Sequence, residues 1–544
     1  MQLLDLPTEL LIHVLMFVPG RDLGKCSQLN RFFDSIIRES STLQYHEELS
    51  LSRTEDNPNC GLSNSEKLHL LKEREHSWIN CRPDFKKSAP INFNPGSVYD
   101  LSAGVYILGD ATRHRLKYLK LPTKPEDPVE WLTFEPRVGP REQRSIVDFA
   151  INLYEHDLIA LITSYSLVQG SEIFVMVELS IHQFSTGTHH PLAKQPVIPV
   201  TRSEIQWGTP SINCEIVGDH MALVTTFWRN PHSRCAVDVY QWKTGKVLLH
   251  IDGEPDSYGG IIFLTENLIL LPNTSANTLE IWKIPSPTED PPDAPIRILG
   301  LPELAPGHTL RYISCRSEPN PTASGATLKS DRPFHPSPKD SVVLLHLRIH
   351  GHPNVTLISV FVHRSSLLDL VEMDDEERNA RLAMGEDGMK IPVPWLAWAP
   401  PVTYCIDCGG DLPSRWITTT CGQRFVMLPT DDWELDVLGH RNPAPLVVYD
   451  FGRGSVRKVQ KQLDEMSPEE KEIYTGPIVR RGATLLEESA HIFADQINSY
   501  LPFVESRTKQ LYGFDGALMD DERIIGIKTD IIGHITSVEI FHFG

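Results

Sequence analysis

The 544-residue sequence lacks an excess of positive charge, a long apolar run and an export signal. Its formal net charge is −20 at pH 7, whereas a non-specific nucleic-acid binder needs a basic face to displace counterions. No run approaches the roughly 18 consecutive apolar residues that predict a transmembrane helix. Acidic Asp5 and Glu9 stand where a signal peptide would carry basic residues. We therefore expect neither nucleic acid nor a membrane as a partner, and a cytoplasmic or nuclear location.

Motifs for catalysis and metal binding are also missing. The sequence contains no GxGxxG, GxSxG or HExxH pattern. The nearest approach to a zinc site is Cys405-Ile-Asp-Cys408 followed by Cys421, but a structural zinc needs four ligands and His440 stands at no recognisable spacing. Nine cysteines without an export signal are typical of reduced thiols. We expect no metal, no cofactor and no catalytic residue.

The residues that are present open with a helical unit. Apolar residues recur every three to four positions between Leu6 and Val18 and predict a helix with one broad apolar face. Pro19-Gly20 ends this helix, and Asp22 is the expected N-cap of a second one that stays apolar on one face as far as Ile37. About 40 residues cannot bury so much apolar surface alone. A partner, from elsewhere in the chain or from another protein, must cover part of it.

This unit closely resembles the F-box family. The matching residues include Leu6-Pro7-x-Glu9-Leu10, Val14-Leu15, Asp22-Leu23 and Leu29. Cys26 departs from the family pattern, because a larger aliphatic is usual there, and Phe33 stands near the usual tryptophan. The resemblance covers residues 3 to about 48 and implies docking onto a Skp-type adaptor, which is held in turn by a cullin scaffold. The residues expected to bind the adaptor are Leu6, Pro7, Glu9, Leu10, Val14, Leu15, Phe17, Val18, Leu23, Cys26, Leu29, Phe32, Phe33 and Ile36.

The sequence does not tell which of these residues face the adaptor and which pack inside the unit. An ordinary helical hairpin that is covered by the rest of the chain is the alternative. Residues 49–90 are predicted to be a helical linker, with a helix in EKLHLLKEREHSWI that places Leu68, Leu71, Glu75 and Trp78 along one side. The predicted domains are therefore the F-box at 1–48, this linker, and a β domain at 91–544.

The long remainder is a repeat. A turn followed by alternating apolar residues occurs in six segments: 102–109, 155–163, 218–226, 265–272, 421–428 and 520–528. An alternating strand with an aromatic residue occurs in seven: 115–122, 177–187, 236–245, 277–284, 355–364, 445–454 and 536–544. Period-two alternation predicts strands with one buried face. Seven copies predict a seven-bladed β-propeller, and another all-β repeat fold is the alternative.

Two details refine the expected propeller. The segment VDVYQWKTGKVLLHI (237–251) is similar to the third strand, turn and fourth strand of a WD-type blade. The last copy reaches Gly544, as expected if the final strand helps to close the ring. Insertions near 285–340, 371–392 and 455–500 interrupt the spacing; the first is rich in loop residues, and the other two carry charged segments.

The fold class is thus mainly β, with a small α-helical F-box before a seven-bladed propeller. The resemblance implies the substrate-recognition subunit of an SCF-type ubiquitin ligase, which holds a target protein but carries no reacting group. Aromatic and arginine residues near predicted loops are the candidates for target binding, although residues of this kind also commonly pack between blades: Trp207, Trp228, Arg229, Trp395, Trp398 and Trp433. Two alternatives remain. One is an F-box scaffold that acts without ubiquitylation, and the other is a propeller enzyme with inward-pointing acids or histidines.

Overall fold

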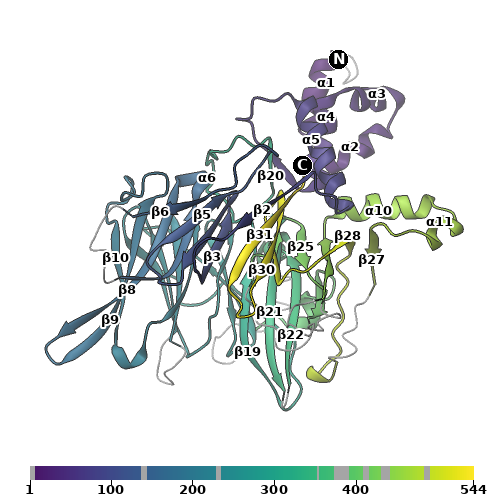
Figure 1. The fold of residues 1–544 in the computed structure, drawn as a ribbon. Helices are drawn as coiled ribbons and strands as arrows, with labels where there is room; N and C mark the ends of the chain where they lie inside the picture. Colours follow the sequence, from purple (N-terminus) through teal and green to yellow (C-terminus); the bar gives the residue numbers. More distant parts are fainter. Residues whose placement is uncertain are drawn as a thin grey trace.

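The computed structural model describes residues 6–136, 144–227, 235–351, 354–372, 391–408, 416–429, 442–482 and 490–544. In these residues a small group of helices near the N-terminus stands on a larger body of strands (Figure 1). The expected division into a helical unit and a mainly β remainder is therefore confirmed. Within the described part of the chain, no helix is long and apolar enough to cross a membrane.

The helical unit consists of four helices: α1 (Thr8–Leu15), α2 (Gly20–Ser27), α3 (Arg31–Glu39) and α4 (Ser41–Ser52). Side-chain caps fix where two of them begin. The Asn30 side-chain oxygen accepts hydrogen bonds from the backbone N–H groups of Phe32 (3.0 Å) and Phe33 (2.9 Å), and Ser40 Oγ accepts one from Leu43 N–H (3.3 Å). Such caps satisfy donors that have no partner inside the helix.

Helix α2 begins earlier than the sequence predicted. Pro19 occupies the N-cap position, so the expectation that Asp22 caps this helix is wrong. Asp22 lies in the first turn instead, and its carboxylate accepts a hydrogen bond from Lys25 Nζ (2.6 Å). Gly20 is required by packing, because a Cβ there would lie 2.5 Å from the backbone oxygen of His46 in α4.

A long helix, α5 (Asn64–Ile79), connects the helical unit to the strands and confirms the helix predicted there. It begins with a capping box formed by Ser63 and Glu66. The residues predicted to share one side are all buried: Leu68, Leu71, Glu75 and Trp78. The Trp78 ring stacks on Phe543 with a centroid separation of 4.1 Å, so α5 packs directly on the strand body.

The strand body contains seven antiparallel sheets in the described residues. Sheets 1 to 3 follow one another in the chain. Sheet 1 contains β3 (Pro95–Ser102), β4 (Val105–Asp110), β5 (Leu116–Lys120) and β6 (Trp131–Phe134), and sheet 2 contains β7 (Ser145–Asn152), β8 (Leu158–Gln169), β9 (Glu172–Gln183) and β10 (Val197–Glu204). Sheet 3 contains β11 (Ser211–Val217), β12 (His220–Thr226), β13 (Cys235–Gln241) and β14 (Lys246–Gly253).

Sheets 4 to 6 continue this order. Sheet 4 contains β15 (Ile262–Thr265), β16 (Leu268–Asn273), β17 (Thr278–Lys283) and β18 (Arg297–Gly300), and sheet 5 contains β19 (His308–Arg316), β21 (Val342–Gly351), β22 (Asn354–His363) and β23 (Thr403–Asp407). Sheet 6 contains β24 (Thr420–Cys421), β25 (Arg424–Met427), β26 (Ala444–Asp450), β28 (Phe503–Tyr512) and β27 (Ile478–Arg480). Sheet 7 contains β29 (Gly516–Met519), β30 (Arg523–Thr529), β31 (Ile535–His542) and β2 (Phe85–Pro90).

Sheet 7 closes the ring, because its outer strand β2 comes from the start of the β region and pairs with β31 at the end. Lys86 lies opposite Phe541, and Ala89 opposite Val538. Hydrophobic clusters fill the spaces between successive sheets, and one of them joins sheet 7 back to sheet 1. Such closure leaves no open sheet edge between the first and last sheets. The predicted β-propeller is confirmed, and its first strand lies inside the predicted linker at 49–90.

The repeated segments occupy equivalent places. Each of the seven aromatic segments overlaps the third strand of its sheet: β5, β9, β13, β17, β22, β26 and β31. The six other segments overlap second strands, and the one second strand that was missed among the described residues is β21. Segment 237–251 forms β13, a turn and β14, as predicted.

Two of the segments predicted as insertions contain regular structure. Residues 285–340 include β18, β19 and the short β20 (Phe334–Pro336), which pairs with β1 (Thr54–Asp56) beside the helical unit. Residues 455–500 include most of α10 (Arg453–Glu465), then α11 (Pro468–Glu472), β27 and a 3-10 turn at Ala490–Ile492. Short helices flank other strands: α6 (Leu153–His156), a 3-10 turn at Ile205–Trp207, α7 (Arg364–Glu372) and α9 (Trp395–Trp398). Most of the insertion near 371–392 lies outside the described residues.

Candidate docking site on the helical unit

The helical unit presents an exposed apolar surface. Phe17 is 80% exposed and Leu29 70% exposed, and neither is covered by the propeller. We call the full set the apolar patch: Leu10, Val14, Met16, Phe17, Leu29 and Phe32. These side chains come from α1, from the turn after it, and from the turn between α2 and α3 with the start of α3. The rest of the described chain therefore leaves them available for another protein.

The helix period explains how neighbouring apolar residues are divided between patch and core. In α1, Leu11 and Leu15 are buried, whereas Leu10 and Val14, each one position earlier, point outward. Residues four apart lie on one side of a helix, so two pairs offset by one residue form two adjacent stripes. The broad apolar face of α1 thus serves the internal core with one stripe and solvent with the other.

The same division occurs in α3. Phe33 is buried, whereas its neighbour Phe32 is 45% exposed. The Asn30 cap fixes the first turn of α3 and with it the direction of both rings. The buried side chains of the unit form one internal core: Leu11, Leu15, Leu23, Phe33, Ile36, Ile37 and Leu43.

The structure corrects part of the predicted adaptor-binding set. Four predicted residues lie in the internal core and cannot touch an adaptor while the unit stays folded: Leu15, Leu23, Phe33 and Ile36. Three more are partly buried against this core: Leu6, Val18 and Cys26. The exposed members are Pro7, Glu9, Leu10, Val14, Phe17, Leu29 and Phe32. Adaptor binding by these seven stays a prediction.

Met16 was missed by the sequence reasoning. It is 37% exposed and lies in the turn that ends α1, next to Phe17. The sequence did contain a signal, because the flexible apolar side chain of Met16 directly precedes Phe17, which was itself predicted to bind the adaptor. Such side chains are common on adaptable binding surfaces.

Contacts through α4 and α5 hold the unit in a fixed place. Asp56, at the end of β1, accepts hydrogen bonds from the Tyr45 hydroxyl of α4 (2.8 Å) and from Lys67 Nζ of α5 (2.8 Å). Arg53 follows α4 and forms an ion pair with Asp340 of the propeller (3.1 Å). The propeller is thus attached to the unit through α4, α5 and β1, while the apolar patch is formed by α1 and the turns beside it.

A buried charge network strengthens the attachment of α5. The guanidinium of Arg424 in β25 is paired with Glu75 of α5 and with Asp450 of β26 (3.2 Å). Glu75 also accepts a hydrogen bond from Arg74 (2.9 Å). Despite the burial, which acts to raise it, the pKa of Glu75 is lowered by Arg424 and Arg74, so the carboxyl stays ionised.

The residues predicted to bind a target do not come together. Trp395 and Trp398 are 5% and 3% exposed and lie in the core between sheets 4 and 5, where Trp398 Nε1 donates to the Gly300 carbonyl (2.9 Å). Their assignment to a binding face is therefore wrong, because α9 turns both rings inward. Trp207 is partly buried and packs edge-on to Phe227 at 5.9 Å. The other three, Trp228, Arg229 and Trp433, lie outside the described residues.

The first strands of successive sheets, such as β3, β7 and β11, lie side by side around the centre of the ring, which we call the central channel. A cavity lies at its end beside β1 of the helical connection and is covered by residues 318–338. Its volume is about 180 Å³, and Tyr154, Glu155 and Arg332 are among its lining residues. Glu155 accepts hydrogen bonds from the backbone N–H groups of Ala323 (2.8 Å) and Gly218 (3.3 Å). Arg332 is paired with Asp521 and Glu522. The charged groups of this cavity therefore hold the covering segment in place.

Deeper in the channel, acids from several sheets meet one arginine. Arg316 of β19 pairs with Asp100 of β3 (3.1 Å), Glu215 of β11 (2.7 Å) and Glu318 (2.8 Å). Burial raises the pKa of Asp100 to about 6 and that of Glu318 to about 7, against the lowering effect of Arg316. Burial raises the pKa of Asp148, in β7, to about 8. We call these four acids and Arg316 the channel cluster. Inward-pointing acids from several sheets are the feature expected of a propeller enzyme.

In the channel cluster Arg316 forms ion pairs with Asp100, Glu215 and Glu318, and the cluster does not form a metal cage. Over the described ranges, no group of three or more histidine, cysteine, aspartate or glutamate side chains is placed to hold a metal ion. The cysteines considered for zinc are separated: Cys405 lies in the core between sheets 4 and 5, Cys421 in the core between sheets 6 and 7. Burial raises the pKa of the Cys405 thiol to about 12, which keeps it protonated at neutral pH.

Comparison with known proteins agrees with this picture for the helical unit. Residues 3–44 match the family described as F-box-like. No curated protein is matched by the chain. The helical unit is thus an F-box-like domain.

Solved structures similar to this chain are distant. The C-terminal WD40 domain of Sif2 is 11% identical, with 85% of this chain and 98% of that chain covered and a TM-score of 0.31. Hsv2 of Kluyvelomyces marxianus is 10% identical, with 66% and 93% covered and a TM-score of 0.26. A putative 6-phosphogluconolactonase from Bacteroides uniformis is 11% identical, with 76% and 88% covered and a TM-score of 0.29. The propeller assignment rests on the strand pairing described above.

Proposed function

We propose that this protein is the substrate-recognition subunit of an SCF-type ubiquitin ligase. The F-box-like domain binds a Skp-type adaptor, which is held by a cullin, and the propeller binds a target protein. The observation that supports this most is the apolar patch, which the domain presents to solvent while its own core is already complete. Exposed apolar surface of this kind is typical of protein–protein contact sites.

The patch has the composition of a binding hot spot. Two phenylalanines and four aliphatic or thioether side chains supply contact area without any charge to desolvate. Full burial of such a side chain is worth about 1.5–3 kcal/mol, and a few residues of this type usually dominate an interface. Phe17, as the most exposed of the six, is the expected centre of the contact.

The function is one of position. The receptor brings a lysine of its target close to a conjugating enzyme and so raises the effective concentration of the two reactants. This requires a partner surface on one domain, a target surface on the other, and a fixed connection between them. The contacts of α4, α5 and β1 provide the connection.

The test is a pair of variants with equal exposure. Phe17→Ala removes the centre of the patch, and Ile531→Ala removes an apolar side chain that is also 80% exposed but lies on a propeller turn. In co-purification with a Skp-type adaptor, we expect Phe17→Ala to weaken binding by about 30-fold, a hot-spot loss of about 2 kcal/mol. Ile531→Ala should bind as the wild type does. Equal adaptor binding by all three proteins would refute the docking role.

The two alternatives separate in further assays. An F-box scaffold would retain the adaptor but would not co-purify with a cullin, and its bound proteins would not accumulate when the gene is deleted. A propeller enzyme is favoured by the inward acids Asp100, Asp148 and Glu215. For an enzyme, replacing Asp100 by Asn would abolish turnover of a small molecule while leaving adaptor binding unchanged.

A further inference from the structure

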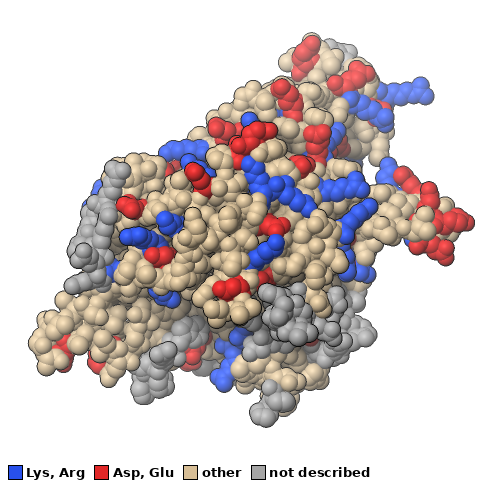
Figure 2. All heavy atoms as spheres, viewed as in Figure 1, with Lys and Arg blue, Asp and Glu red and all other residues tan. Residues whose placement is uncertain are grey.

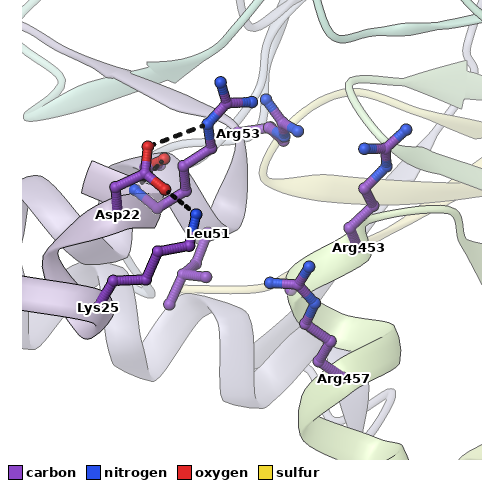
Figure 3. A pocket seen from close by; sticks show the side chains of 9 residues that line it. Asp22, Lys25, Leu51, Arg53, Arg453 and Arg457 are labelled. Atoms are coloured by element: carbon purple, nitrogen blue, oxygen red, sulfur yellow. Dashed lines mark hydrogen bonds and ion pairs between the residues drawn. The ribbon is translucent and has the colours of Figure 1, made fainter. Parts of the chain in front are cut away.

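A cleft between the F-box-like domain and the propeller gathers basic side chains, which we call the basic cleft. Its volume is about 360 Å³, and it is lined by Arg21, Asp22, Lys25, Ser50, Leu51, Arg53, Arg453, Gly454 and Arg457. The cationic side chains come from α2, from the residue after α4 and from α10, and they converge on one space (Figure 3). Five cations thus face a single carboxylate in a protein whose formal net charge is −20.

The negative groups nearby do not neutralise this cluster. Asp22 pairs with Lys25 (2.6 Å) and lies 3.8 Å from Arg21, and the Lys25 hydrogen bond lowers the pKa of its carboxyl. Arg53 pairs with Asp340. For Arg453 and Arg457, the described residues supply no carboxylate within ion-pair distance. Both side chains are exposed to the cleft and carry positive charge without a counter-ion from this part of the chain.

The beginning of α10 brings two of these cations close together. A helix N-terminus carries partial positive charge and favours acidic residues. The carboxylate at this helix start is Asp450, which accepts hydrogen bonds from Gly452 N–H (2.8 Å) and Ser455 Oγ (2.9 Å) and is paired with Arg424, while the first turn itself has no acidic residue. Arg453 and Arg457 are instead four residues apart, a spacing at which like charges repel. The neighbouring α11 follows the usual rule, with a Ser467 capping box and two glutamates in its first turn. Figure 2 shows acidic side chains gathered at the tip where α11 lies.

Packing fixes the cleft in shape. Gly454, in the first turn of α10, touches the end of α4 so closely that a Cβ would collide with the backbone oxygen of Leu51. Arg21 N–H donates to Ser50 Oγ (3.1 Å), which joins the start of α2 to α4. An adjoining cavity of about 220 Å³ shares Arg21, Arg53 and Arg453 and adds Lys339 together with the carboxylates of Asp340 and Asp369. The excess of positive charge is therefore confined to the basic cleft itself.

We propose that the basic cleft binds a small anion that carries several phosphate groups. Guanidinium groups bind phosphate oxygens with paired hydrogen bonds, and the cleft offers those of Arg453 and Arg457, which have no carboxylate partner among the described residues. The volume falls in the range of about 300–1,000 Å³ that small-molecule sites occupy. Such a ligand relieves the repulsion between Arg453 and Arg457 and ties the two domains together. The proposal does not rest on a role in ubiquitin ligation.

The experiment uses the full chain with inorganic tripolyphosphate and inorganic phosphate as probes, at constant ionic strength. We expect calorimetry to show one site for tripolyphosphate, with weaker binding of phosphate, and the melting temperature to rise with tripolyphosphate. Arg453→Gln and Arg457→Gln should each weaken tripolyphosphate binding by about tenfold or more, because each removes a hydrogen bond to a charged group. Lys461→Gln is the matched control, since it removes the same charge from the same helix outside the cleft.

Three results would overturn the proposal. The first is no saturable tripolyphosphate binding, or an equal loss in Lys461→Gln, which would indicate only a diffuse charge effect. The second is tighter binding of a doubly phosphorylated peptide of otherwise neutral sequence, which would make the ligand a protein segment. The third is loss of the Skp-type adaptor in Arg453→Gln, which would assign the cleft to that partner. Phe17→Ala should still bind tripolyphosphate, so failure of this proposal and of the docking role are distinguishable.

Discussion

Replacement of Asp148 by asparagine is expected to stabilise the protein at pH 8 and to flatten its dependence of stability on pH. Asp148 lies in β7 and lines the central channel, and its Oδ1 accepts a hydrogen bond from Phe149 N–H (2.9 Å). Burial, helped by the nearby Asp100 and Glu215, raises the pKa of this carboxyl to about 8. Asparagine keeps the size and the acceptor oxygen but carries no charge.

The sign follows from proton binding. The pKa of an aspartate in the unfolded chain is about 3.9, whereas Asp148 in the folded chain holds its proton up to about pH 8. The folded state therefore binds more protons between these values, and the free energy of unfolding falls as pH rises through this window. The stabilisation that the wild type gains from holding this proton in the folded state is fully present below about pH 4 and is lost by about pH 8.

The magnitude has an upper limit. One proton difference changes the free energy of unfolding by about 1.4 kcal/mol per pH unit. Asp148 is partly exposed to the channel, and water there screens its charge, so we expect a slope below this limit. Burial raises the pKa of Asp100 to about 6 and that of Glu318 to about 7, so both carboxyls add to the slope of the wild type and of the variant alike.

The assay is chemical denaturation at several pH values between 5 and 8, for the wild type and for Asp148→Asn. The control is Asp127→Asn: hydrogen bonds from Thr123 and Lys124 lower the pKa of this exposed carboxyl, so its removal should not stabilise the protein at pH 8. A less stable Asp148→Asn protein at pH 8, or an unchanged slope, would show that Asp148 is ionised in the fold and would refute the reasoning.

Two other changes probe the connection between the domains. Gly20→Ala should separate α2 from α4, because its Cβ would meet the His46 carbonyl at 2.5 Å, and should weaken adaptor binding together with the melting temperature; an unchanged melting temperature would contradict the close packing. Arg424→Met should leave Asp450 buried without an ion-pair partner and Glu75 with Arg74 alone, and it should lower the free energy of unfolding by about 3–5 kcal/mol, measured by denaturant titration. A loss below about 1 kcal/mol would indicate that this network is solvated, as surface ion pairs are.

The strands that could be predicted from the sequence are those whose signal is local. The third strands, such as β13 and β17, alternate in polarity and carry aromatic residues, so each is visible in a window of ten residues. Inner strands such as β24, with two residues, are too short for any period to appear. The outer strand β2 belongs to sheet 7 only through pairing with a segment more than 400 residues away, which no local pattern shows.

The docking surface shows the same limit. Periodicity placed Leu10, Leu11, Val14 and Leu15 on one broad face, and it could not divide this face between core and solvent. The division depends on where α3 and α4 lie against α1, which is a property of tertiary packing. The two tryptophans of α9 were misassigned for a related reason, because an aromatic side chain at a loop packs a core as readily as it binds a partner.

The rigidity of the connection has a consequence for the proposed receptor. A flexible linker would spread the target over a large volume, and the effective concentration of its lysines would fall steeply with linker length. Here α5 is buried against sheets 6 and 7 through Trp78 and the Arg424 network, and α10 presses on α4 at Gly454. A target on the propeller would therefore be held at a fixed distance from the adaptor. On this reasoning a flexible insertion after Ser52 should leave adaptor and target binding intact and still slow ubiquitylation; an unchanged rate would show that position is set elsewhere in the assembly.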